Sequence, residues 1–153
     1  MSIILGKYFD EFTEGEEIQT LGRTVTEADI VNFSGFSGDF NPLHTDAAFA
    51  ATQPFGGRIA HGMCGMSIAI GLLVRLNFLE GTIMAFFGVE NWRFKWPIMI
   101  GDTIHVNAKI AQKKETRKPD RGLIFIDCDV VNQNGQSTMC GRLVILMKRT
   151  PKS

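Results

Sequence analysis

The residues best suited to chemistry lie in one short stretch, residues 38–44. Asp39 and His44 are five positions apart, with Asn41 and Pro42 between them. Pro42 cannot occupy a helix interior, and it disfavours helical dihedral angles at Asn41, which itself favours turns. We therefore expect a bend that lets the carboxylate and the imidazole point at one place. Such a pair can activate a water molecule, because histidine titrates near neutral pH and a carboxylate can orient it.

The same spacing also suits a loop without chemistry. Asp39 would then form an Asx turn, and His44 would lie on the surface. Spacing by itself does not separate these two interpretations.

About twenty residues later the chain enters an apolar segment at His61 and Gly62. No charged residue occurs from Met63 to Val74, and the span 63–78 predicts a buried helix about 24 Å long, at about 1.5 Å per residue. The span is too short and too rich in glycine to indicate a membrane crossing. At the helix start, the Gly62 N–H could hold a thioester oxygen that gains negative charge. Alternatively, the glycines serve only close packing.

Three segments together resemble a known family. They are GDFNPLHTD (residues 38–46), FGGRIAHGM (residues 55–63) and FKWPIMIGD (residues 94–102). The first two closely resemble the hydratase signature of the MaoC-like dehydratases, which include the (R)-specific enoyl-CoA hydratases. The third is similar to a strand-and-turn segment of that family. The resemblance extends from about residue 8 to residue 148.

The resemblance implies an α+β hot-dog fold, in which an antiparallel sheet wraps a long central helix, usually in a dimer. It also implies hydration of a trans-2-enoyl thioester to an (R)-3-hydroxyacyl thioester, and the reverse dehydration. Asp39 and His44 match the family's catalytic dyad. Gly62 matches the residue whose main-chain N–H holds the thioester oxygen, and Asn41 matches a loop residue that shapes the site. Some members carry a hydroxyl side chain where this chain has Ile70. Ser67, almost one turn earlier, is therefore a candidate substrate contact.

A coenzyme A thioester carries phosphates, so basic side chains are expected near the mouth of the site. Arg58, Arg93 and Lys95 are the candidates, although each could equally be a solvated charge. His61 is a further candidate for the substrate site, where it is expected to brace the helix start through hydrogen bonds. The alternative, a metal held by His61 with His44, Asp39 and Asp46, has irregular ligand spacing, and we predict no metal. No cofactor is expected beyond the coenzyme A of the substrate.

The composition describes an ordinary globular chain. Its 153 residues suit one domain, residues 1–153, and its formal net charge of zero comes without a basic stretch of the kind that binds nucleic acid. We expect a homodimer, because one hot-dog unit leaves an exposed sheet edge. Three cysteines without a CxxC motif, and no recognisable leader or peroxisomal ending, favour the cytoplasm.

The remaining elements follow from local patterns. A strand is predicted near 17–25, then a helix capped by Thr26 and Asp29 with Ile30, Phe33 and Phe36 on one face. A short helix at 47–51, capped by Asp46, either covers the substrate or belongs to a fixed loop. Period-two patterns predict strands at 84–96, 103–113, 122–132 and 137–148, pairing as antiparallel neighbours. In the first of them one face would hold Phe86, Gly88, Glu90, Trp92, Phe94 and Trp96.

Two other functions are compatible with the same predicted fold. One is a hot-dog thioesterase, which would hydrolyse the thioester and release free thiol. The other is an acyl-CoA-binding subunit without catalysis, against which an intact Asp39–His44 pair argues. The sequence leaves the acyl group open, and an acyl-carrier-protein thioester is also possible.

Overall fold

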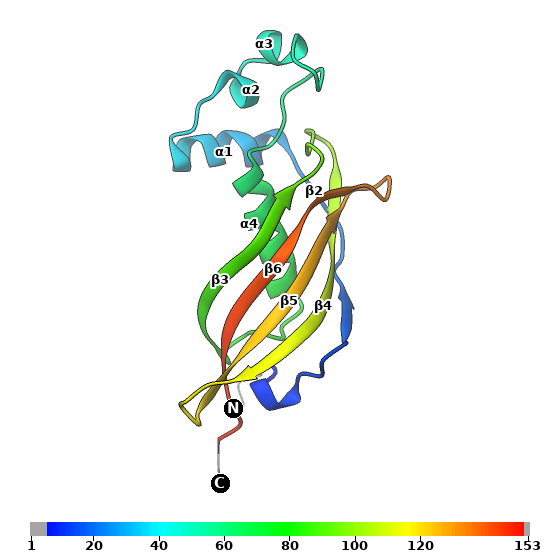
Figure 1. Ribbon diagram of the computed structural model, residues 1–153. Coiled ribbons are helices and arrows are strands. Elements are labelled where there is room, and N and C mark those ends of the chain that lie inside the picture. Colours follow the sequence, from blue (N-terminus) through cyan, green and yellow to red (C-terminus); the bar gives the residue numbers. More distant parts are fainter. Residues whose placement is uncertain (1–5, 152–153) are drawn as a thin grey trace, which may run out of the picture.

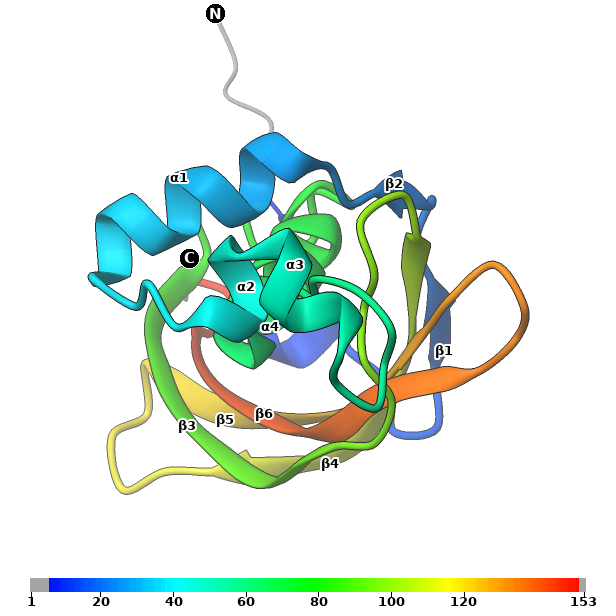
Figure 2. The ribbon, with the colours of Figure 1, turned by 90° about the horizontal axis from the view of Figure 1, so that it is seen from above.

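A six-stranded antiparallel sheet wraps around one helix in the computed structural model, which describes residues 6–151 (Figures 1 and 2). The strands are ordered β1-β4-β5-β6-β3, and β2 also pairs with β4. The central helix is α4 (Gly62–Val74), and the strands are β1 (Glu17–Gln19), β2 (Arg23–Thr24), β3 (Ile83–Phe94), β4 (Thr103–Glu115), β5 (Arg121–Val131) and β6 (Ser137–Lys148). This arrangement is the expected α+β hot-dog fold.

The other helices gather where α4 begins. They are α1 (Glu27–Ser37), α2 (Pro42–Thr45) and α3 (Ala47–Ala51). Figure 2 shows α2 and α3 lying over α4, with α1 running beside them. A single 3-10 turn, η1 (Phe9–Glu11), precedes β1. No helix in the described part of the chain is long and apolar enough to cross a membrane. The predictions about an N-terminal leader and a peroxisomal ending concern residues 1–5 and 152–153 in part, and these residues lie outside the described range.

The core lies between α4 and the inner face of the sheet. The predicted alternation in β4 and β5 is confirmed, because Ile104, Ile110, Ile124 and Ile126 are at most 1% exposed. Burying one such side chain contributes about 1.5–3 kcal/mol. Helix α4 approaches the sheet closely at Gly65, where a Cβ would meet the Met139 Cε atom at 2.7 Å. Helix α4 can lie this close to the sheet because Gly65 has no Cβ.

Several local predictions are confirmed. Thr26 and Asp29 form the capping box of α1, and the Asp46 carboxylate accepts the Phe49 N–H at 2.9 Å as the cap of α3. Strands β4 and β5, and likewise β5 and β6, are antiparallel neighbours, as predicted. Gly135 has a φ of +75° in the turn between β5 and β6, a backbone conformation that favours glycine.

The predicted pairing of β3 with β4 is wrong. Strand β3 pairs with β6 and forms one edge of the sheet, while β4 pairs with β5 and with the two short strands β1 and β2. The connection between β3 and β4 instead follows the chain that enters α4. There Ala60 N–H donates to the Ile98 carbonyl at 2.8 Å, and Ile59 bridges Met99. A short connection thus crosses the open side of the sheet rather than forming a hairpin.

Three further expectations need correction. The strand near 17–25 is interrupted, because the Thr20 hydroxyl accepts the Val106 N–H at 2.9 Å between β1 and β2. Helix α4 ends at Val74 rather than 78, and Asn77 has a left-handed φ of 56°. Phe36 does not lie on a buried face: it is 90% exposed, because α1 meets the core mainly through Ile30.

The period-two pattern in β3 also fails. Register shifts occur at three places along its pairing with β6, and each added residue moves the following side chains to the opposite face. The side chains that were predicted to share one face of β3 are therefore divided between its two faces. Trp92 packs against the core, while Phe86 and Phe94 are 46% and 55% exposed.

Candidate active site

The bent loop before α2 is built by turn-forming side chains, as predicted. Gly38 ends α1 in the left-handed conformation, with a φ of +77°, and reverses the chain. The Asp39 carboxylate accepts the Asn41 N–H at 3.1 Å, and the Asn41 side chain accepts the Leu43 N–H at 3.0 Å. Asn41 thus caps α2, with Pro42 at its first position.

This loop brings the carboxylate of Asp39 and the imidazole of His44 together. One ligand-type atom from each of Asp39, His44 and His61 lies within 4.8 Å of the other two. His44 Nδ1 is 2.8 Å from the Ile59 main-chain oxygen. A carbonyl oxygen can only accept, so Nδ1 carries the proton and Nε2 is left as the acceptor in the neutral ring. Asp39 is exposed and His44 partly buried, so a small molecule can reach the pair.

The helix start lies beside this pair. Gly62 is the first residue of α4, as predicted, and its N–H has no hydrogen-bond acceptor within residues 6–151. The Phe94 ring covers the glycine so closely that a Cβ would lie 2.8 Å from Phe94 Cε1. The N–H stands at the positive end of the α4 dipole, where it can stabilise a negatively charged oxygen.

A largely apolar pocket of about 410 Å³ reaches the helix start. His61, Gly62 and Phe94 line it, whereas Asp39 and His44 do not. His61 connects the pocket with the Asp39–His44 pair, because its ring stacks on that of His44 with centroids 3.8 Å apart. The other lining residues are Phe55, Ile59, Ala60, Met63, Lys95, Trp96, Pro97, Ile98 and Met139.

The three basic candidates are placed differently. Lys95 lines the pocket at the helix start, and its Nζ lies 3.5 Å from the Ser137 hydroxyl. Arg93 is exposed on β3. The Arg58 guanidinium forms an ion pair with Glu27 at 2.5 Å, and its side chain is 18% exposed. Arg58 therefore already has an anionic partner, whereas Lys95 has none within residues 6–151.

Ser67 lies away from the Gly62 pocket. Its hydroxyl donates to the Met63 main-chain oxygen at 2.8 Å, one turn earlier in α4. The side chain faces a shallow depression shared with Phe33 and Phe36 of α1. Within this chain, the structure thus does not bring Ser67 to the Asp39–His44 pair.

The hydrogen bonds of the two histidines favour a role other than metal binding. Their rings are stacked, 28° from parallel with centroids 3.8 Å apart. His44 Nδ1 and His61 Nε2 each lie close to a main-chain oxygen. Asp46, the fourth residue of the metal interpretation, caps α3 instead.

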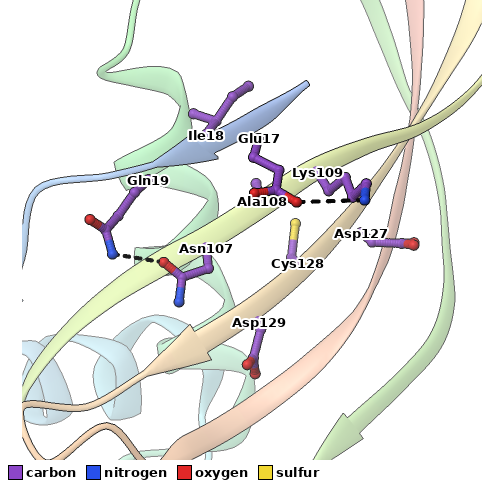
Figure 3. A pocket seen from close by; sticks show the side chains of 9 residues that line it. All are labelled: Glu17, Ile18, Gln19, Asn107, Ala108, Lys109, Asp127, Cys128 and Asp129. Atoms are coloured by element: carbon purple, nitrogen blue, oxygen red, sulfur yellow. Dashed lines mark hydrogen bonds and ion pairs between the residues drawn. The ribbon is translucent and has the colours of Figure 1, made fainter. Parts of the chain in front are cut away.

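A second pocket, of about 570 Å³, lies over β1, β4 and β5 (Figure 3). Two contacts cross it, from Gln19 to Asn107 at 2.9 Å and from Lys109 to Glu17 at 3.5 Å. Its Cys128 is not a nucleophile at neutral pH, because burial and then Asp127 raise the thiol pKa to about 12. The pocket contains none of the predicted site residues.

Sequence reasoning missed two features of the site. The first is the Ile59 carbonyl, which orients His44; every residue has a carbonyl, so no side-chain pattern could reveal it. The second is the stack of His61 on His44. The two histidines are 17 positions apart, and only the path of the chain through α2 and α3 brings them together.

Comparisons with known proteins agree with this architecture. A family model described as "MaoC like domain" matches residues 11–124. Protein MaoC of Klebsiella aerogenes is 43% identical over 75% of this chain, which spans about a third (33%) of that protein's length. The (R)-specific enoyl-CoA hydratase of Aeromonas caviae is 31% identical over 82% of this chain and 88% of its own.

Solved structures give the same result. A protein of Archaeoglobus fulgidus, described as a monoamine oxidase regulatory protein, has a TM-score of 0.88 at 38% identity, covering 97% of this chain and 98% of that one. The R-hydratase PhaJ1 of Pseudomonas aeruginosa has a TM-score of 0.78 at 29% identity, covering 94% and 86%. The family model matches well over half of the chain, and with these relatives it shows that the chain belongs to the MaoC-like dehydratase family.

Proposed function

We propose that this protein catalyses the (R)-specific hydration of trans-2-enoyl-CoA to (R)-3-hydroxyacyl-CoA, and the reverse dehydration. One observation carries the proposal. The Asp39 carboxylate and the His44 imidazole converge to within 4.8 Å beside a helix start whose Gly62 N–H has no acceptor in the described chain. Hydration of an enoyl thioester needs these two functions close together, namely proton transfer and stabilisation of an enolate oxygen.

The proposed reaction uses one water molecule held between Asp39 and His44. Its oxygen bonds to the β-carbon while its proton passes to one member of the pair. The π electrons move to the thioester oxygen, which accepts the hydrogen bond from Gly62 N–H. That proton passes to the other member of the pair, which delivers it to the α-carbon of the resulting enolate, so both members return to their starting state. Delivery from a single side gives syn addition.

The surroundings of the pair support a thioester substrate with an apolar portion. The pocket at Gly62 is lined mostly by apolar side chains, and Lys95 is its cationic residue. Lys95 and the exposed Arg93 are the proposed contacts for the coenzyme A phosphates. Water and the thioester are the only reactants, so the proposal needs no metal and no additional cofactor.

The proposed functional unit is a homodimer. Strand β3 lies at a sheet edge and exposes Phe86, Phe87 and Val89, which are 46%, 63% and 41% accessible in the single chain. Helix α4 carries no charge, yet its Met63 is 56% exposed. Pairing of two β3 edges would cover this apolar surface and complete the edge. A cytoplasmic location stays a prediction, supported by three free thiols.

The decisive experiment incubates the purified protein with crotonyl-CoA. We expect the enoyl absorbance to fall and chiral chromatography to find (R)-3-hydroxybutyryl-CoA. Release of free thiol, measured with a thiol reagent, would instead identify a thioesterase. Saturable binding without any absorbance change would identify an acyl-CoA-binding subunit. A panel of enoyl-CoA chain lengths would then define the acyl group.

A further inference from the structure

His61 is a buried titratable residue that the proposed reaction does not use. It directly precedes α4 and is 3% exposed. Its ring stacks on His44 at 3.8 Å and contacts the Phe33 ring, whose centroid is 5.0 Å away. Its side chain makes no capping hydrogen bond to α4. The start of the helix therefore does not explain why an imidazole occupies this position.

The hydrogen bonds of His61 define its protonation. Nε2 lies 3.0 Å from the Asp39 main-chain oxygen and 3.4 Å from the Ser34 hydroxyl. The carbonyl oxygen is the nearer partner and can only accept, so Nε2 carries a proton. Nδ1 is buried without a partner within residues 6–151. With the proton on Nε2, only a lone pair is left without a partner at Nδ1. The geometry therefore favours the Nε2–H tautomer.

His44 holds the opposite tautomer. Its Nδ1–H donates to the Ile59 carbonyl, two residues before His61. One residue thus touches both members of the pair: His61 donates to the backbone of Asp39 and lies against the ring of His44. The same ring is also part of the wall of the Gly62 pocket. A shift of His61 would move the carboxylate and the imidazole relative to each other.

We propose that His61 is a positioning residue, which holds the Asp39 main chain and the His44 ring in the geometry needed to share one water molecule. This inference rests on the proposed hydration. It requires the Nε2–H donor, so a side chain that keeps a donor there preserves the geometry and an apolar ring does not. Misplacing reacting groups by about 1 Å can cost about 10²-fold in rate.

Two substitutions separate the donor from the ring. His61→Phe keeps a flat ring against His44 and loses the donor, whereas His61→Gln keeps an N–H that can reach the Asp39 carbonyl. We expect kcat for crotonyl-CoA hydration to fall about 10²-fold in His61→Phe with KM unchanged. His61→Gln should recover most of that loss. Phe33→Leu is the control, because it also alters packing on His61 but leaves the donor in place; it should lower Tm with little change in kcat.

Unchanged kcat in His61→Phe overturns the proposal, and so does an equal loss in all three variants that follows their Tm values, since that indicates packing alone. A long-range ¹H–¹⁵N NMR spectrum of the wild-type protein tests the same idea without activity. Opposite tautomers, Nε2–H for His61 and Nδ1–H for His44, support it, and an Nδ1–H tautomer of His61 overturns it. Lack of any hydration by the wild-type protein would defeat the proposed function but not this tautomer assignment.

Discussion

Replacing Asp39 by Asn is the most direct perturbation of the proposed chemistry, because the structure isolates the effect on proton transfer. The Asp39 Oδ1 atom accepts the Asn41 N–H at 3.1 Å, and the Asn41 side chain in turn caps α2. An Asn amide oxygen can accept the same N–H. Asp39 is also exposed, so Asp39→Asn should keep the loop and change the free energy of unfolding by no more than about 0.5 kcal/mol.

The effect on rate should be far larger. The amide cannot take up or release a proton near neutral pH as a carboxyl group does, so the contribution of general acid–base catalysis is lost. That contribution is about 10²- to 10⁴-fold, which corresponds to about 2.7–5.4 kcal/mol in the activation free energy. The loss should appear in kcat, since the substrate-contacting surfaces at Gly62 and Lys95 are untouched.

The assay is the initial rate of crotonyl-CoA hydration, measured beside thermal unfolding. Asp46→Asn is a matched control: Asp46 is also an exposed carboxylate that accepts a main-chain N–H, here as the cap of α3. It should retain both activity and stability. Near-normal turnover in Asp39→Asn, or an equal loss in Asp46→Asn, would refute the assignment of proton transfer to Asp39.

Three other predictions follow from the same structure. Gly62→Ala should lower kcat/KM for hydration by about 10²-fold, because the added Cβ would lie 2.8 Å from Phe94 Cε1 and displace the helix start. A double variant with Gly62→Ala and Phe94→Ala should regain activity. Failure to regain it would contradict the steric explanation. Phe87→Lys should convert the proposed homodimer to a folded monomer in analytical ultracentrifugation, because it places a charge on the β3 edge. Leu21→Lys, also at an exposed apolar site (77% accessible), should leave the proposed dimer intact. A dimer that persists in Phe87→Lys would argue against an interface at the β3 edge. Cys128 should not react with a thiol reagent at pH 8 in the native protein, because its pKa of about 12 leaves only about one thiol in 10⁴ ionised. The thiolate forms only as the pH rises toward 12. Mass spectrometry measures the labelling, and rapid labelling of Cys128 ahead of the half-buried Cys140 would contradict the burial of Cys128.

Local chemistry made several features predictable from sequence. The bend at 38–44 follows from Asn41 and Pro42, whose conformational preferences act within a few residues and need no distant contact. The caps of α1 and α3 were found for the same reason. The alternation in β4 and β5 identified the core face, because each strand has one buried side. The family and its fold came from the match of whole motifs.

Tertiary structure alone decided the rest. The register shifts in β3, and its pairing with β6 rather than β4, depend on which strand edges remain free once the sheet has formed. The partner of His44 is a main-chain carbonyl, which no residue type announces. The stack of His61 on His44 depends on how α2, α3 and the chain entering α4 pack together. Sequence by itself thus determined which groups are available for chemistry, because side-chain types and local turns are encoded locally. Their distances and hydrogen-bond partners were decided by long-range packing, because these contacts join residues that are far apart in the chain.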